Sequence, residues 1–250
     1  MTDRRSVLAT LTGISATAAL GVRPGSLWAE SEAPARARET IAVLGTGRFG
    51  GSIGKRLSTL GYPVVYGSRT PDTDRVRELI ARSGPAASVA SLKDAAAQSS
   101  IVVFAVPWEP VKALLPQLGS MTGKLLIDPM IAKPVIVEGY PFPAHTPMST
   151  AEQLQAWVPD AHVVKAFISI SYGTLADPAR AGGPVSVPYA GAAGSAKERV
   201  AQIIAELGLE AMDAGPLICA THLENLLWFE VAINRSNKGL YELSLRKVRS

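Results

Sequence analysis

A glycine-rich segment between a short apolar run and a helical pattern constrains the fold of this chain more than any other feature. Residues 40–44 are apolar and rich in β-branched side chains, which is typical of a buried parallel strand, and residues 52–60 predict a helix. Between them, Gly45, Gly47 and Gly50 form the pattern G-x-G-x-x-G. The first glycine allows a tight turn, the second lets the backbone approach a pyrophosphate, and the third permits close packing of helix on strand. This order of elements predicts a dinucleotide site at the helix N-terminus, the alternative being a glycine turn without a ligand.

The end of the next predicted strand, residues 63–67, favours NADP over NAD. It leads into Ser68 and Arg69, and no Asp or Glu lies between Gly45 and Thr70. An NAD site places an acidic residue about 20 residues after the glycines to bind the ribose 2′-hydroxyl, whereas an arginine there accommodates a 2′-phosphate. A guanidinium holds a phosphate through paired charged hydrogen bonds. We therefore predict NADP(H) as the cofactor, the alternative being that Arg69 is a solvated turn residue.

Strand and helix patterns alternate along the rest of the chain. This alternation predicts the α/β class, with a Rossmann-like, doubly wound parallel sheet. Arg75, at the start of the next helix, is a second candidate for the phosphate, although we favour a helix-surface charge. The further predicted helices span residues 75–82, 92–98, 111–118, 150–157 and 195–207, and the further predicted strands span residues 101–106, 124–128, 162–167, 185–189 and 209–213.

Residues at the carboxyl ends of the predicted strands are candidates for cofactor contact, because ligands bind at that edge of such sheets. Val106 and Pro107 follow one strand and are predicted to contact the cofactor. Trp108 either lies against the nicotinamide ring or packs as a loop aromatic. Asp128 ends the next strand, and the proline-rich residues 129–147 predict a loop over the site.

Composition and charge exclude several classes of protein. The 250 residues are 47% hydrophobic and 18% charged, which excludes a disordered chain. The formal net charge of +4 comes entirely from the last 16 residues, where five Lys and Arg residues face one Glu. Because the rest of the chain is neutral, we predict no nucleic-acid partner. Cys219 is the single cysteine, which excludes an intrachain disulfide, and we predict no metal site.

The first 35 residues have the pattern of a targeting signal. Arg4 and Arg5 precede a mildly apolar run over residues 7–22, and residues 33–35 form an A-x-A cleavage pattern. The paired arginines resemble a twin-arginine export signal. The apolar run is shorter than the roughly 18 residues of a membrane span, so we expect no stable membrane insertion. We expect a periplasmic protein exported by the twin-arginine route, the alternative being a cytoplasmic one.

From about Thr40 to the C-terminus, the chain resembles the NADP oxidoreductases that depend on the deazaflavin coenzyme F420. The glycine pattern is shared by many folds, but the later sequence blocks in this order are much more specific. The blocks are G-T-G-R-F-G at residues 45–50, G-S-R at 67–69, V-P-W-E at 106–109, V-V-K-A-F at 163–167, D-A-G-P-L at 213–217, L-E at 223–224 and N-K-G-L-Y-E-L at 237–243.

The resemblance implies an NADP-binding Rossmann domain over residues 36–168 and a small C-terminal lobe over residues 169–250 that completes the substrate site. It implies hydride transfer between the nicotinamide and a deazaflavin or flavin, and related modules of membrane ferric reductases pass electrons from NADPH to a flavin. No catalytic residue is predicted. The residues that the resemblance assigns to the cofactor are Gly45, Thr46, Gly47, Arg48, Phe49, Gly50, Ser68 and Arg69.

Two positions depart from the family pattern near the second substrate. Ile168 stands where the family commonly has His or Asn, and Asp128-Pro129 replaces a common Asn-Pro. A more apolar pocket suits another flavin, a quinone-like acceptor or a small carbonyl compound. The alternative function is an NADP-binding sensor or interaction module without turnover. The leucines near Leu223 predict a helix face that packs within the C-terminal lobe or against a second subunit, as in a homodimer.

Overall fold

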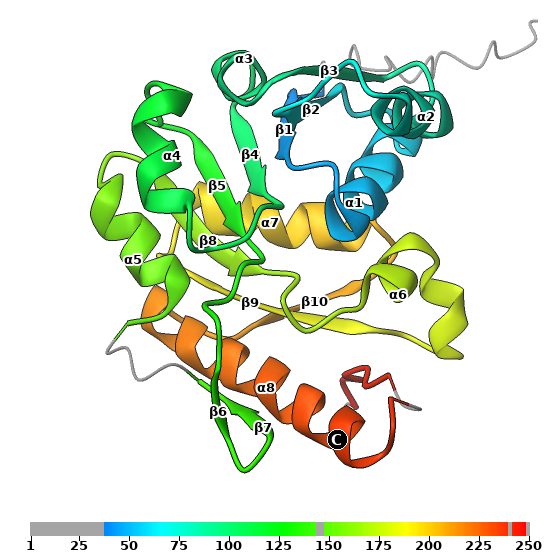
Figure 1. The fold of residues 1–250 in the computed structure, drawn as a ribbon, viewed down its shortest axis with the longest axis vertical. Helices are drawn as coiled ribbons and strands as arrows, with labels where there is room; N and C mark the ends of the chain where they lie inside the picture. The colour runs from blue at the N-terminus through cyan, green and yellow to red at the C-terminus, as the bar shows by residue number, and fades with distance from the viewer. Residues whose placement is uncertain (1–37, 144–147, 240–241, 249–250) are drawn as a thin grey trace, which may run out of the picture. The chain divides into compact units, whose positions relative to one another are not determined.

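One eight-stranded sheet organises the computed structural model, which describes residues 38–143, 148–239 and 242–248 (Figure 1). Its strand order is β10-β9-β8-β5-β4-β1-β2-β3, and every neighbouring pair is parallel except β8–β9. The order reverses at β1, from which the chain passes first to one side of the sheet and then to the other. The strands are β1 (Ile41–Leu44), β2 (Val64–Ser68), β3 (Ala87–Ser91), β4 (Ile101–Phe104), β5 (Leu125–Asp128), β8 (His162–Ala166), β9 (Ser186–Gly191) and β10 (Glu210–Asp213).

Helices cover both faces of this sheet. Because side chains alternate along a strand, Ile41 and Val43 of β1 enter one apolar cluster and Ala42 and Leu44 enter the other. The first cluster includes side chains of α1, α2 and α7, and the second includes side chains of α3, α4, α5 and α8. The helices are α1 (Arg48–Thr59), α2 (Asp74–Ser83), α3 (Leu92–Ala97), α4 (Val111–Leu118), α5 (Thr150–Trp157), α6 (Tyr172–Ala176), α7 (Ser195–Glu206) and α8 (Ala220–Ser236).

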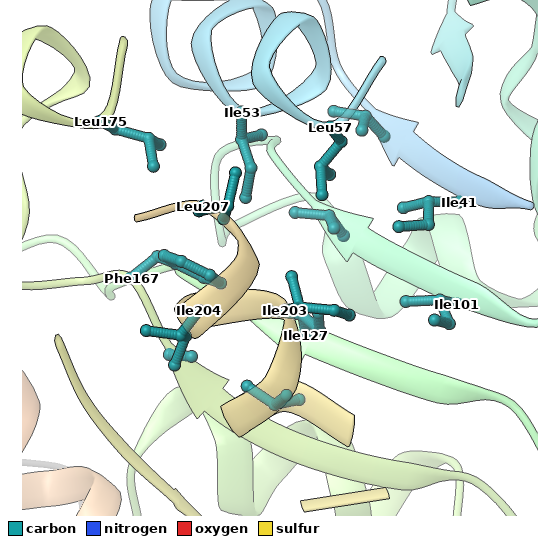
Figure 2. Close-up of a cluster of buried hydrophobic side chains, with 14 of the residues drawn as sticks. Ile41, Ile53, Leu57, Ile101, Ile127, Phe167, Leu175, Ile203, Ile204 and Leu207 are labelled. Carbon is teal, nitrogen blue, oxygen red and sulfur yellow. The ribbon is translucent and has the colours of Figure 1, made fainter. Parts of the chain in front are cut away.

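Figure 2 shows the first cluster, in which side chains of α1 and α7 meet over the sheet. Ile53 and Leu57 project from α1 toward α7, which carries Ile203, and Ile41 and Ile101 lie to one side of them, on β1 and β4. All five are at most 1% exposed. The predicted class, a Rossmann-like α/β fold with a mostly parallel sheet, is therefore confirmed.

Some local features differ from the sequence prediction, among them β3, the start of α1 and the segment after β5. β3 was not expected, because its small residues are partly exposed at the sheet edge and show no apolar run. α1 begins at Arg48, four residues before the predicted start, because Gly50 and Gly51 weaken the helical pattern without ending the helix. The loop predicted over residues 129–147 contains a hairpin of β6 (Val135–Val137) and β7 (Tyr140–Phe142).

The predicted boundary at residue 168 falls within the sheet. β9 and β10 follow this boundary, yet β9 pairs with β8, and the described residues form one compact unit. The segment predicted as a C-terminal lobe therefore contributes two strands as well as α6, α7 and α8. The signal predicted over residues 1–35 lies outside the described residues. Within the described part of the chain, no helix has both the length and the apolar character needed to cross a membrane.

Candidate functional site

The loop between β1 and α1 shows why two of its glycines are sterically required. Gly45 has φ of 115°, and a Cβ there would lie 2.2 Å from the carbonyl oxygen of Ala105. A Cβ on Gly50 would lie 2.2 Å from the carbonyl oxygen of Gly45. Both contacts are far too short for any side chain, so these glycines close the turn and hold α1 against the end of β4.

Gly47 differs, because space lies around it. Its φ is −72°, and no atom lies within 4 Å of a Cβ placed there. No steric demand within the protein explains this glycine, but a pyrophosphate that approaches the backbone does. Gly47 is also the N-cap residue of α1, and no side chain caps the helix there. The N–H groups and dipole of a helix N-terminus favour an anion at this point, so the residues present fit the diphosphate of a dinucleotide.

Cationic and aromatic side chains surround this loop. α1 has no acidic residue in its first turn and opens with the exposed Arg48. The guanidinium carbon of Arg48 lies 5.6 Å from the ring centre of Tyr172 at the start of α6. Phe49 packs against the first apolar cluster. Thr46 is half-buried, and its carbonyl oxygen accepts a hydrogen bond from Nη2 of Arg75 at 3.3 Å.

The two arginines considered for a 2′-phosphate occupy different places. Arg69 is exposed just after β2 and is not among the residues that line the pocket at the loop. Ser68 is buried, and its Oγ accepts a hydrogen bond from the Thr70 amide at 3.1 Å. Arg75, in the first turn of α2, lines the pocket together with Arg48. The structure therefore brings Arg75 to the loop, although the sequence favours a helix-surface charge for this residue.

The segment after β4 contributes apolar contacts. Val106 is half-buried, and its Cγ1 would lie 3.3 Å from a Cβ on Gly45, whereas Pro107 is exposed. Trp108 stacks on Trp157 of α5, with ring centres 5.0 Å apart and planes 11° apart. Of the two alternatives for Trp108, the structure shows the packed loop aromatic.

A buried ion cluster lies at the carboxyl ends of β5 and β8. The sequence pattern did not predict it. Nζ of Lys165 donates to Oε1 of Glu224 at 2.7 Å and to Oγ1 of Thr150 at 2.7 Å, and it lies 3.3 Å from Oδ2 of Asp128. It also donates to the carbonyl oxygen of Met130. The side chains of Lys165 and Asp128 are 0% exposed, and that of Glu224 is 12% exposed.

This cluster brings together residues from sequence blocks that are far apart in the chain. The lysine of V-V-K-A-F, the glutamate of L-E and the aspartate that ends β5 meet around one ammonium group, although Lys165 and Glu224 are 59 residues apart. Met130 and Thr150 mark the two ends of the segment that carries the hairpin, and Lys165 bonds to both. Lys165 therefore holds both ends of that segment against the sheet.

The two departures from the family pattern face the interior. Asp128 Oδ1 accepts from the Met130 amide at 2.7 Å, and Oδ2 accepts from Oγ1 of Thr150 at 2.8 Å, so both carboxylate oxygens are used within the protein. Ile168 is 5% exposed and belongs to the same apolar cluster as Met130. The preceding residue, Phe167, has φ of 64°, which is uncommon for a bulky side chain. Neither Asp128 nor Ile168 offers a free polar group to a second substrate.

Glu242, in the C-terminal segment, contacts the N-terminus of α6. Its carboxylate accepts hydrogen bonds from Oγ of Ser171 and Oγ1 of Thr174, at the N-terminus of α6. Burial alone would raise the pKa of Glu242, but these hydrogen bonds outweigh burial and hold it below the usual range. Glu242 thereby fastens α6, and with it Tyr172, beside Arg48.

Comparisons with known proteins agree with this geometry. The family model described as NADP oxidoreductase, coenzyme F420-dependent, matches residues 40–132. A crystal structure from Arthrobacter sp. FB24, provisionally described as an F420-dependent NADP-reductase, is 30% identical, covers 84% of this chain and 100% of that one, and superimposes with a TM-score of 0.72. A hypothetical protein, SMa0349, from Sinorhizobium meliloti is 28% identical over 73% of this chain and 87% of that one, with a TM-score of 0.63.

More distant relatives share parts of this architecture. Metalloreductase STEAP2 of Mus musculus is 30% identical over 189 residues, which are 75% of this chain and 35% of that protein, so the chain spans about a third of the curated relative's length. An imine reductase from Myxococcus stipitatus, solved with NADP⁺, is 19% identical with a TM-score of 0.56 over 80% of this chain and 68% of that one, which shows a shared fold. Because the match to the Arthrobacter protein covers its whole length, and the family model covers the phosphate loop and four strands beyond β1, this chain belongs to the family of coenzyme F420-dependent NADP oxidoreductases.

Proposed function

We propose that this protein binds NADP(H) with its diphosphate at the β1–α1 loop and transfers hydride between the nicotinamide and a small-molecule acceptor. The observation that carries the proposal is the open backbone at Gly47, between two glycines that the fold itself requires. Bound NADPH supplies the hydride. The chain's own contribution is to bind and orient, through the N–H groups at the start of α1 and the nearby Arg48 and Arg75.

The preference for NADP(H) over NAD(H) rests on charge near the end of β2. No carboxylate lies between Gly45 and Thr70 to bind a ribose 2′-hydroxyl. Arg69 follows β2 directly, and Arg75 reaches back from α2 to the carbonyl of Thr46. We propose that the two guanidinium groups share the 2′-phosphate, with Arg75 on the side of the loop.

Replacing either arginine should reduce affinity for NADPH selectively. A hydrogen bond to a charged group contributes about 1.5–3 kcal/mol, so Arg69→Ala and Arg75→Ala should each weaken NADPH binding roughly 10- to 100-fold. NADH binding should change by less than about threefold, because NADH lacks the 2′-phosphate. Titration calorimetry with both nucleotides measures the difference. Arg77→Ala is the matched control, since Arg77 is exposed on α2 and paired with Asp74 at 2.6 Å. Equal losses for NADPH and NADH would refute the role of both arginines.

We propose a flavin-like acceptor, either a deazaflavin or a flavin, or a small organic acceptor such as a quinone or carbonyl compound. Family membership supports the flavin-like compounds. The buried and fully bonded Asp128 and the apolar Ile168 support an acceptor that needs few polar contacts at those two positions. The apolar Ile168 is also the feature that supports the alternative, an NADP-binding sensor or interaction module that does not turn over.

We propose that the N-terminal segment directs export through the twin-arginine route to the periplasm, because Arg4 and Arg5 precede a modest apolar run. An Arg4→Lys, Arg5→Lys variant should remain in the cytoplasm, because the export route recognises the arginine pair. The substitution keeps the positive charge and removes only that pair. Fractionation followed by immunoblotting measures the distribution. An unchanged periplasmic fraction would overturn this proposal, and unaltered NADPH binding by the variant would show that it is folded.

We also propose a homodimer that forms through the C-terminal segment. α8 buries Leu223 at 4% exposure but leaves Phe229 60% exposed, so part of its apolar surface has no cover within the described protomer. Phe229→Glu should shift the species seen by sedimentation velocity from dimer to monomer. A monomeric parent protein would refute the proposal.

A further inference from the structure

The outward face of α1 forms the floor of a basic cavity. α1 buries Ile53 and Leu57 on its inner side and directs Lys55 outward, while α2 and α6 flank it (Figure 1). The cavity, of about 330 Å³, begins at Thr46 and Gly47 of the phosphate loop and extends along α1. Its far end therefore lies over a helix surface, away from the sheet edge where the dinucleotide binds.

Four cations line this cavity, as two pairs with the same spacing. Arg48 and Lys55 are seven residues apart on α1, and Arg75 and Arg82 are seven residues apart on α2. Seven residues make about two helical turns, or a rise of roughly 10 Å, so each pair presents its cations on one helix face. Arg48 and Arg75 stand at the phosphate loop. Lys55 and Arg82 lie about two turns further along, beyond the reach of a diphosphate held at Gly47.

The second pair has no charge partner among the described residues. Neither Lys55 nor Arg82 forms an ion pair there, and Nε of Arg82 donates only to the backbone carbonyl of Glu78, at 3.3 Å. No Asp or Glu lines the cavity. The position of Arg82 in the last turn of α2 suits the helix dipole, but Lys55, in the middle of α1, has no such explanation.

A glycine brings the two helices close enough for these cations to act together. A Cβ on Gly51 would lie 3.3 Å from Cδ1 of Leu79, so Leu79 of α2 packs directly on the backbone of α1, and a larger residue at position 51 would require Leu79 to shift. Across α1, the ring of Tyr172 is 48% exposed and borders the same cavity. The cavity thus combines an unpaired basic end with an exposed aromatic face.

We propose that Lys55 and Arg82 form a second anion site, separate from the diphosphate site, that binds a phosphate or carboxylate group. This proposal rests on the proposed function in one respect only, which is that NADPH occupies the β1–α1 loop where the cavity begins. Two sources supply such a group: the anionic tail of an acceptor, or a free phosphate compound.

Inorganic pyrophosphate tests the site in protein saturated with NADPH, by titration calorimetry at low ionic strength. One equivalent should bind to the saturated protein, and the Lys55→Gln, Arg82→Gln variant should bind it at least tenfold more weakly, with a Kd for NADPH within about twofold of the parent. Lys93→Gln, at an exposed position on α3, should bind pyrophosphate as the parent does. Pyrophosphate that only competes with NADPH, or unaltered binding by the double variant, would overturn the proposal.

The same titration without NADPH separates this proposal from the proposed function. The parent should bind two equivalents, one at the loop and one at the second site, and the double variant should bind one. Loss of the second equivalent in the double variant supports the site even if NADPH itself does not bind. A single equivalent in both proteins would overturn it.

Steady-state kinetics with a phosphorylated and an unphosphorylated flavin identify the source of the anion. If the site holds an acceptor tail, the double variant should raise KM for FMN at least tenfold and leave KM for riboflavin unchanged. If neither KM changes while pyrophosphate binding is lost, the site takes a free phosphate compound. Both outcomes support the site and differ only in its ligand.

Discussion

Lys165→Met is expected to destabilise the folded protein by about 3–5 kcal/mol, because it leaves two buried carboxylates without their cation. Lys165 is fully buried, and Asp128 and Glu224 both lie within ion-pair distance of its Nζ. For a chain of this size, the loss corresponds to roughly 6–20 °C in Tm, at about 2–4 °C per kcal/mol. Urea unfolding followed by circular dichroism measures it.

Two variants make this result interpretable. Adding Glu224→Gln to Lys165→Met should recover part of the lost stability, because it removes one of the unpaired charges. Lys93→Met, at an exposed position on α3, should change the free energy of unfolding by no more than about 0.5 kcal/mol. A Lys165→Met variant within about 1 kcal/mol of the parent would show that the buried cluster does not hold the sheet and the hairpin segment together.

Gly47→Ala is expected to abolish most NADPH binding while leaving the fold intact. The alanine has room, because Gly47 has φ of −72° and a Cβ there has no neighbour within 4 Å. In the complex that we propose, the diphosphate fills this space, so the methyl group should weaken NADPH at least about 100-fold through loss of the close approach. Fluorescence titration with NADPH measures the affinity, and Tm should stay within about 3 °C of the parent.

The neighbouring glycine provides the contrast. Gly50→Ala should lower Tm as well as NADPH affinity, because its Cβ would lie 2.2 Å from a backbone oxygen. A Gly47→Ala variant that binds NADPH normally would place the diphosphate elsewhere. One that fails to fold would mean that Gly47 serves the fold rather than the cofactor.

The phosphate loop is the part of the site that local sequence predicts best. A side chain on Gly50 would clash with the backbone of Gly45, and one on Gly45 would clash with Ala105 at the end of the adjacent strand β4. The spacing of the two glycines in the sequence therefore predicts the turn. The same holds for the strand and helix order, because apolar runs such as β1 and β4 are buried on both faces.

Contacts between residues far apart in the sequence cannot be predicted in this way. Arg75 and Thr46 are 29 residues apart, and an exposed helix arginine has the same local pattern whether or not it borders a pocket. Lys165 sits in an apolar strand, and its partner Glu224 comes from α8, so only the packing of α5 and α8 over β8 reveals a buried cluster. The recurrence of V-V-K-A-F with a later L-E was the available signal, and it indicated family rather than structure.

The most direct test of the central claim is NADPH consumption by the purified protein with a panel of acceptors. The panel comprises the deazaflavin, FMN, FAD, a soluble quinone and a ferric chelate, with loss of NADPH absorbance as the readout and NADPH deuterated at C4 to trace the hydride. An NADP-dependent oxidoreductase should consume NADPH with at least one acceptor and form, for each NADPH, one equivalent of the two-electron-reduced deazaflavin, flavin or quinone, or two equivalents of the ferrous chelate. Tight binding of NADPH without turnover on any acceptor would contradict the claim and favour a sensor or interaction module.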